Sequence, residues 1–421
     1  MINHMPVKAK MSIPASLCMR CRGAKRLCGL SYCPIEIEMI TRSKISGRSN
    51  IKEIDGSSPP SVFVGRYGYP KVSVYPSAPP IRGDTSNLSV SASWLDMPLE
   101  EFISARLSML RGSREFAVDA AVDPDALLQR IQEISLSKGS VDVDILLERP
   151  IDTSKIEIDD HVTPMGPASP MKTFSLDPSG TEQHIEKVYY DTDMKAKDAV
   201  MKLYENGIDI ERISQSLSVG IMGEGKNRKI VPTRWSITAV DSMISDDLIE
   251  EAKQRPTIDK FLAYRMRVNG NYFMAILTPS NWIYEWGESW FPGSTWNMWG
   301  NQAEVEIDYE GYNGRKTYPD IGGCYYSSRV AVGEAFKKLG RSGGAITWRE
   351  IYPGFNIPVG VWFVRENMRR LFAQKPEVFD TIDEAMNYVS EWMRVPPEKW
   401  KSNSYVYKTL KYNNLERFFS L

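Results

Sequence analysis

The sequence predicts an α+β fold with mixed sheets and packed helices, extended by an N-terminal four-cysteine zinc knuckle and a C-terminal binding tail. Segments that alternate apolar with polar residues are interspersed with helical periodicity, without a regular strand–helix–strand rhythm. At 421 residues and 42% hydrophobic content, the chain is too long for one ordinary core. We therefore expect a zinc knuckle and linker in 1–50, a main α+β domain in 51–310, a C-terminal α+β domain in 311–411, and a binding tail in 412–421.

The charge balance limits the classes of function. The chain has 52 Lys and Arg against 53 Asp and Glu, so the whole molecule does not attract nucleic acid and any polyanion site must be a local patch. No apolar run is long enough to span a membrane, and the N-terminus lacks the charged-then-apolar layout of a secretory signal. These patterns predict a cytoplasmic protein with no membrane partner.

The N-terminal cysteines have the spacing of a metal site. Cys18, Cys21, Cys28 and Cys33 follow a C-x2-C-x6-C-x4-C pattern, in which four thiolates can surround zinc tetrahedrally. Five cysteines in a large cytosolic chain argue against a disulfide framework. The pattern leaves open four reduced thiols, a redox C-x-x-C pair and an iron–sulfur cluster. Structural zinc is the cofactor we expect, because exposed thiols have little reason to cluster.

The main domain is expected to begin after an irregular connection. Residues 34–60 are rich in Ser, Gly and Arg and end in SSPP, which indicates a linker. SVFV and KVSVY then alternate like half-buried strands, and the GRYGYP between them predicts a turn that carries Arg66. Helices are expected over 99–112 and 123–137, followed by a strand in VDVDILLER.

The middle of the chain carries a cluster of glycines and cations. KVYYDTDMKAKDAV predicts a short strand and then a helix capped by Asp191 or Thr192. GEGKNRK and VPTRWS follow, and they offer backbone donors and positive side chains to phosphate oxygens. The residues that we expect to bind a nucleotide or phosphate are Arg66, Gly223, Gly225, Lys226, Arg228 and Arg234. The alternative is a solvated basic loop, because the segment is not a Walker A loop.

Five of the eleven tryptophans fall in residues 271–300. Such a cluster can stack bases or fill a core, and core is the expected role because tryptophan buries a large area. Further along, a helix is expected over 328–339. An amphipathic helix is expected in DTIDEAMNYVSEWM, with its inward residues being Ile382, Ala385, Met386, Val389 and Trp392.

Any catalysis must rely on carboxylates. The three histidines of the chain lie beside no nucleophile pattern and form no metal-binding spacing. Asp191, Asp193 and Asp241 are the candidates to activate water at a glycosidic or phosphoester bond. The alternative is structural, since capping of a helix start explains Asp191 and Asp193 without any chemistry.

The last residues, NNLERFFSL, place apolar groups where chain ends are usually polar. On one tight helical turn, Leu415, Phe418 and Phe419 would form a compact plug. The segment before them is polar, so the plug does not continue a core pattern and would fit a pocket on a partner protein. The alternative is a tail that packs on its own domain.

The order of these motifs resembles the archaeal Nre family of DNA repair proteins. The resemblance rests on the four-cysteine knuckle, PPSVFVGRYGYPKV, PMGPASP, EKVYYDTDMKAKDAV, GKNRKIVPTRWSITAVDS and the tail, and it extends from about Cys18 to the last residue. It implies repair of damaged DNA through binding of the sliding clamp PCNA by a C-terminal peptide. Leu415 matches the aliphatic position of such peptides, and Phe418 and Phe419 match the aromatic pair. Tyr412 stands where glutamine is usual, which removes an amide and implies weaker binding.

Two hypotheses of different classes follow. In the first, the protein is a repair scaffold that places its zinc knuckle and basic loops on DNA and its tail on the clamp. In the second, it is a hydrolase whose Lys226, Arg228 and Arg234 hold the phosphate of a nucleotide or modified DNA end, while an aspartate handles protons. One deep pocket uniting these residues would favour the enzyme, and a flat basic surface would favour the scaffold.

Overall fold

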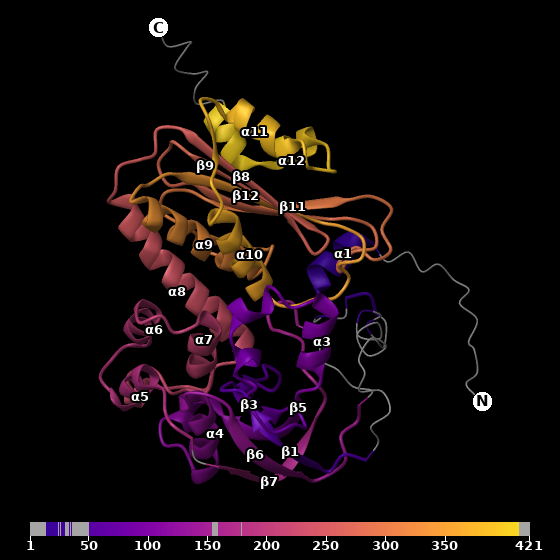
Figure 1. The fold of residues 1–421 in the computed structure, drawn as a ribbon, viewed down its shortest axis with the longest axis vertical. Coiled ribbons are helices and arrows are strands. Elements are labelled where there is room, and N and C mark those ends of the chain that lie inside the picture. The colour runs from indigo at the N-terminus through magenta and orange to yellow at the C-terminus, as the bar shows by residue number, and fades with distance from the viewer. Residues whose placement is uncertain are drawn as a thin grey trace, which may run out of the picture.

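Two mixed sheets in separate layers form the body of the protein. The structure is a computed structural model and describes residues 14–23, 25, 27–29, 33, 35, 50–153, 159–177 and 179–411. A long helix, α8 (Thr233–Lys253), runs between the two halves and contributes to the cores of both (Figure 1). The predicted α+β class with mixed sheets is therefore confirmed. The predicted tail residues Tyr412, Leu415, Phe418 and Phe419 lie outside the described residues.

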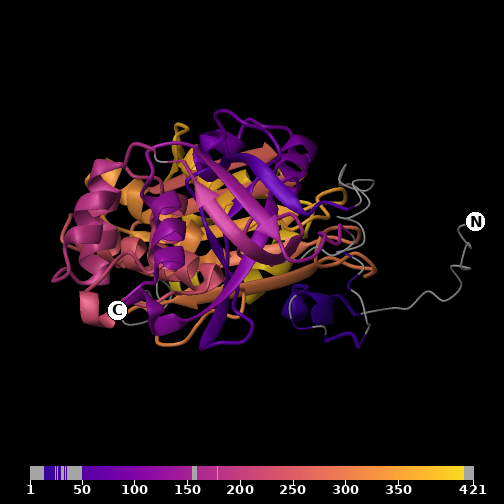
Figure 2. The same cartoon turned by 90° about the horizontal axis from the view of Figure 1, so that it is seen from below.

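The first sheet is built from residues 53–176 and faces the viewer in Figure 2. Its order is β1-β6-β7-β5-β3-β2, with β4 on β5, and β5 and β7 pair in parallel while the other pairs are antiparallel. The strands are β1 (Glu53–Ser58), β2 (Phe63–Val64), β3 (Lys71–Tyr75), β4 (Ser77–Ala78), β5 (Leu110–Ala117), β6 (Val141–Leu147) and β7 (Ala168–Leu176). The predicted strands in SVFV, KVSVY and VDVDILLER are all confirmed.

The predicted linker over 34–60 is wrong at its end, because β1 lies inside it. The Gly and Ser residues of β1 read as a flexible connection, yet they pair in register with β6. Gly56 is required there, since a Cβ at this position would lie 2.0 Å from the carbonyl oxygen of Pro79. Composition alone missed a strand whose small side chains allow a close backbone contact.

Helices cover the first sheet on the side toward α8. They are α4 (Ala126–Leu136), α5 (Gln183–Tyr190), α6 (Ala196–Glu205) and α7 (Ile210–Ser218). The strand predicted in KVYY is wrong, because these residues end α5. Helix α3 (Leu99–Leu107) is shorter than the predicted 99–112, because the chain from Leu110 onward joins β5. In both cases the sheet and core decided the conformation against local pattern.

The second sheet is built from residues 261–379. Its order is β11-β10-β12-β9-β8-β13, with β10 and β12 parallel and the other neighbours antiparallel. The strands are β8 (Phe261–Val268), β9 (Asn271–Thr278), β10 (Tyr284–Trp290), β11 (Glu304–Glu310), β12 (Gly344–Ile351) and β13 (Glu377–Phe379). Every residue of β9 is buried, as expected for a central strand covered on both faces.

Helices cover both faces of this sheet (Figure 1). Helices α8, α9 (Cys324–Leu339) and α10 (Trp362–Phe372) lie on the face toward the first sheet, and α11 (Ile382–Ser390) and α12 (Pro397–Asn403) lie on the outer face. The predicted helix over 328–339 begins earlier, at Cys324. The predicted inward face of α11 is confirmed for Ile382, Ala385, Met386 and Val389. Trp282, Trp286, Trp290 and Trp296 are core residues as expected, whereas Trp299 is 40% exposed.

A buried ionic network joins the two halves of the molecule. Arg365 of α10 has no exposed surface; it donates to both carboxylate oxygens of Asp241 on α8, at 2.8 and 3.0 Å, and to Glu211 on α7 at 2.6 Å. Burial raises the pKa of Asp241 and raises that of Glu211 to about 7, although Arg365 opposes both shifts. Asp241 is thus a structural partner sealed from water, which argues against its predicted catalytic role.

The division of the body at residue 310 stays a prediction. The first sheet ends at Leu176 and the second starts at Phe261, with helices between them. Among the helices that the structure describes, none combines the length and apolar character needed to cross a bilayer.

Replacing Glu211 with glutamine should flatten the pH dependence of stability. The pKa of folded Glu211 is about 7, above its ordinary 4.5, so its stabilising contribution is complete below the ordinary pKa and is lost as the pH rises through 7. The wild-type free energy of unfolding should therefore fall by up to about 3 kcal/mol relative to Glu211→Gln between pH 4.5 and 7. Guanidinium unfolding at several pH values measures this, with the exposed Glu205→Gln as control. Parallel profiles for wild type and Glu211→Gln would contradict the assignment.

Candidate functional site

Two of the sequence motifs that lie far apart in the chain form one surface. The backbone N–H of Val64, in SVFV, donates to Thr233 Oγ1, in VPTRWS, at 2.8 Å. On the next residues of each motif, the Tyr69 ring contacts the Trp235 ring with centroids 5.1 Å apart. The turn between β2 and β3 is therefore fixed against the first turn of α8. We call this the turn–helix surface, made of residues 65–70 and 233–235.

Behind the turn–helix surface lies a buried carboxylate that contacts two guanidinium groups and an imidazole ring. Asp160 pairs with Arg234 of α8, with Arg22 at 3.6 Å, and with Nδ1 of His161 at 3.1 Å. Burial would raise the pKa of Asp160, but His161, Arg234 and Arg22 together hold it well below its usual range. Asp160 therefore stays ionised and links three segments of the chain.

His161 carries this link to the second half of the protein. Its Nε2 accepts the backbone N–H of Gly323, at the start of α9, at 2.8 Å, and lies 2.6 Å from the hydroxyl of Tyr318. Because Nε2 accepts, the proton of the neutral ring sits on Nδ1, which faces Asp160. Glycine is required at 323, since a Cβ there would lie 2.3 Å from the imidazole ring.

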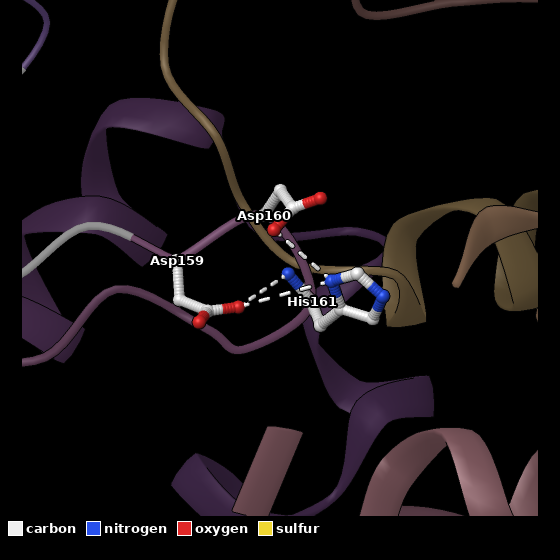
Figure 3. A group of neighbouring side chains, drawn as sticks. All are labelled: Asp159, Asp160 and His161. Carbon is white, nitrogen blue, oxygen red and sulfur yellow. Dashed lines mark hydrogen bonds and ion pairs between the residues drawn. The ribbon is translucent and has the colours of Figure 1, made fainter. Parts of the chain in front are cut away.

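Asp159, Asp160 and His161 offer ligand atoms within 4.8 Å of one another, as Figure 3 shows. A metal ion would have to compete there with two guanidinium groups. Arg234 already pairs with both carboxylates, at 2.8 Å for Asp159, and Arg22 approaches Asp160 from the other side. The arrangement is therefore better explained as an ion-paired hub than as a metal centre.

Arg66 lines a small cavity at the edge of the turn–helix surface. The cavity measures about 40 Å³, enough for about one water or for the oxygens of a phosphate group but too small for a nucleoside. Arg111 lines it as well; this side chain is 1% exposed, lies between the rings of Phe63 and Tyr75, and donates from Nε to the carbonyl oxygen of Gly166 at 2.6 Å. The remaining lining residues are Gly65, Tyr67, Asp159, Val162, Thr163 and Met165.

The GEGKNRK loop forms a second candidate site, separate from the turn–helix surface. Its Gly225 N–H donates to the carbonyl oxygen of Thr192 at 2.8 Å, so the loop rests on the turn before α6. Arg228 is largely buried, and its guanidinium donates to the carbonyl oxygens of Gly223 at 3.0 Å and Tyr189 at 2.6 Å. Arg228 thus holds the loop against α5, which leaves Lys226 and Lys229 as the exposed cations of the loop.

Asp191 and Asp193 lie on the turn beneath that loop. Asp191 accepts the backbone N–H groups of Asp193, at 3.3 Å, and Met194, at 3.1 Å, so it caps the turn before α6 rather than the helix itself. Asp193 is exposed. The structure therefore brings Asp191, Asp193, Gly223, Gly225, Lys226 and Arg228 together, places Arg66 with Arg234 at the turn–helix surface, and buries Asp241 elsewhere.

Several residues that lie behind the turn–helix surface give no usable signal in the sequence. Arg22 and Asp160 meet only in the folded chain, and periodicity does not indicate pairs so distant in sequence. Arg111 sits in a segment that was expected to be helical. The weak signal for His161 is its place in the Pro-rich HVTPMGPASP, because long irregular segments inside a domain are often functional loops.

The four N-terminal cysteines lie around one small cavity. Leu17, Gly23, Ile35 and Trp299 complete its wall, and Cys21 Sγ accepts the N–H of Leu27 at 3.4 Å. Burial and the neighbouring thiols raise the pKa of Cys18 to about 11. A thiol set of this kind suits a cation that stabilises thiolates, so the donor chemistry fits the predicted zinc.

Arg22 fastens this cysteine segment to the body. The residue follows α1 (Ala15–Cys21) directly and has a positive φ of 46°. Its guanidinium donates to the carbonyl oxygen of Ile321 at 2.5 Å, lies 3.3 Å from Glu306 on β11, and faces Asp160. The cysteine segment and the turn–helix surface are thus connected through the same buried carboxylate.

Comparison with known proteins agrees with the resemblance of the motifs. The family model described as archaeal Nre, N-terminal matches residues 27–297, and the one described as archaeal Nre, C-terminal matches residues 310–418. The chain is 41% identical to the DNA repair protein NreB of Archaeoglobus fulgidus over 95% of this chain and 99% of that protein. It is 36% identical to NreA of the same organism, over 91% and 95% of the two chains, and 33% identical to NreA of Haloferax volcanii, over 81% and 83%. No solved structure matches significantly. The chain belongs to the archaeal Nre family.

Proposed function

We propose that this protein is a DNA repair factor that is recruited to the sliding clamp PCNA through residues 412–421 and that contacts DNA through its basic surfaces. The observation that carries the proposal is the similarity, over nearly the whole chain, to proteins named as DNA repair proteins. The aliphatic and aromatic residues of the tail, Leu415, Phe418 and Phe419, supply the plug that a clamp pocket would take.

The position at which the described chain ends supports a tail that acts on a partner. Lys411 pairs with Asp383 of α11, on the outer face of the second sheet. In Figure 1 that layer lies at the opposite end of the molecule from the first sheet. A clamp that holds the tail would therefore leave the turn–helix surface accessible to DNA.

The scaffold hypothesis is better supported than the hydrolase hypothesis. Of the proposed catalytic carboxylates, Asp241 is sealed against Arg365 and Asp191 caps a turn. The proposed phosphate ligands are divided between two places, with Arg234 neutralised by Asp159 and Asp160. This arrangement does not supply the single pocket in which a carboxylate would activate water beside bound phosphate.

Cys18, Cys21, Cys28 and Cys33 would hold a structural zinc ion in this proposal. Zinc would supply no reaction there; it would keep the thiols ionised and close the segment that carries Arg22. Arg22 would then attach this segment to the body through its contacts with Glu306, Asp160 and the carbonyl oxygen of Ile321. The four-cysteine knuckle thereby serves to position one side chain in the core of the molecule.

Removal of the tail should abolish clamp binding. Calorimetric titration of the cognate PCNA with the full chain should give a measurable heat, and a chain that lacks residues 412–421 should give none. In the full chain, Phe418→Ala with Phe419→Ala should reproduce the loss because the two rings fill the pocket, whereas Asn413→Ala with Asn414→Ala should not. Equal binding with and without the tail would sink the recruitment proposal.

The purified protein should contain one zinc ion per chain by plasma mass spectrometry. Cys28→Ser should lower that content, because it removes one of four ligands, and Cys324→Ser should leave it unchanged. Iron in place of zinc would instead indicate a cluster. Zinc retained in full by Cys28→Ser would show that the cysteines do not form the site.

A further inference from the structure

The turn–helix surface exposes three aromatic side chains to solvent at one place. Tyr67 is 68% exposed, Tyr69 is 50% exposed and Trp235 is 44% exposed. Large aromatic rings usually bury most of their surface, and clustered exposed rings indicate a contact surface. Every nucleobase has a flat face that can stack on such rings, independent of sequence.

The rings stand on a rigid base. The turn is closed by two backbone hydrogen bonds, from Gly65 to Ser73 at 2.8 Å and from Lys71 to Gly68 at 2.9 Å. Trp235 belongs to the first turn of α8, and its N–H donates to the carbonyl of Pro232 at 2.8 Å. Because Tyr69 packs on Trp235, a strand that binds would not have to order this surface first.

Positive charge lies directly beside the rings. The Arg66 guanidinium carbon is 5.2 Å from the centre of the Tyr67 ring, and Arg66 and Arg111 both line the small cavity below. The carboxylate in that lining, Asp159, is paired with Arg234, which it shares with Asp160. An anion that enters the cavity therefore meets two guanidinium groups, which suit phosphate oxygens.

The size of the cavity selects the form of the ligand. A space of about 40 Å³ can receive the oxygens of a phosphate group but cannot enclose a base. The bases must then remain outside, where Tyr67, Tyr69 and Trp235 are exposed. A free mononucleotide would leave its base unenclosed, while successive nucleotides of one strand could use the cavity and the rings together.

We infer that the turn–helix surface is a binding site for single-stranded nucleic acid, in which Arg66 and Arg111 hold a backbone phosphate and Tyr67, Tyr69 and Trp235 stack the neighbouring bases. The inference rests on the proposed role in DNA repair and specifies how DNA would be held. This site is separate from the GEGKNRK loop, where the guanidinium of Arg228 already donates hydrogen bonds to backbone carbonyl oxygens.

The affinity of the full-length protein for a labelled oligothymidine of twenty nucleotides, measured by fluorescence anisotropy, tests the site. Tyr67→Ala and Trp235→Ala should each weaken binding about tenfold or more, while Tyr69→Phe should bind like wild type because the ring remains. Arg66→Gln should weaken binding and reduce the slope of log affinity against log salt by about 0.7. Circular dichroism checks that each variant is folded.

The matched control lies at the competing site. Tyr190 is 73% exposed and neighbours Tyr189, which holds Arg228, so Tyr190→Ala and Lys226→Ala report on the GEGKNRK loop. Both should leave oligothymidine binding unchanged. Loss of binding in these two variants, with Tyr67→Ala and Trp235→Ala intact, would overturn the inference and move the site to the loop.

Two competition experiments identify the form of nucleic acid that binds. Thymidine monophosphate at millimolar concentration should not displace the oligothymidine, and an unlabelled duplex should compete less well than the unlabelled strand. Displacement by the mononucleotide at the concentration of the strand, or preference for the duplex, would overturn the single-strand assignment. Clamp binding by Trp235→Ala should be intact, so a failure here is distinguishable from a failure of the recruitment proposal.

Discussion

The ionised carboxylate of Asp160 is the constraint on which the arrangement of the site depends. It is largely excluded from water, and such a charge is tolerated only with close partners. Its partners come from three separate segments: Arg22 after the cysteines, Arg234 on α8, and the adjacent His161, whose far nitrogen accepts from the start of α9. Satisfying one buried charge therefore fixes the cysteine segment, the turn–helix surface and the second half of the protein relative to one another.

This constraint explains why an exposed surface can be rigid. Tyr67, Tyr69 and Trp235 extend from a closed turn and a helix start whose inner residues are held by buried polar contacts. The described chain ends at Lys411, which pairs with Asp383 of α11 on the outer face of the second sheet. In the proposed function, a clamp that holds residues 412–421 would leave the turn–helix surface free for nucleic acid. The buried ion pairs of Arg365 with Asp241 and Glu211 join the two halves of the protein into one body.

The sequence correctly predicted structural features that are determined by residues close together in the chain. The proximity of the four cysteines, the β2–β3 turn, the buried face of α11 and the tryptophan core could all be predicted, because each follows from spacing or from apolar area. The roles of residues whose partners lie far away in the sequence could not be predicted in this way. Arg228 and Asp241 read as site residues, yet one is committed to backbone carbonyls and the other to Arg365. The sequence does not indicate the partners of Arg22 and Arg111, because only the folded chain brings them to Asp160 and to the Arg66 cavity.

Hydrogen exchange on Asp160→Asn tests whether the buried carboxylate of Asp160 fixes the arrangement of the site. If Asp160 fixes the site, the substitution should speed exchange of the amides of Val64 and Gly323 and of the segment from Cys18 to Arg22, while strands β8 and β9 stay protected as in the wild type. The exposed Asp193→Asn should leave all of these rates unchanged. Wild-type exchange at all three places in Asp160→Asn would contradict the account, because the surface would then be held by other contacts.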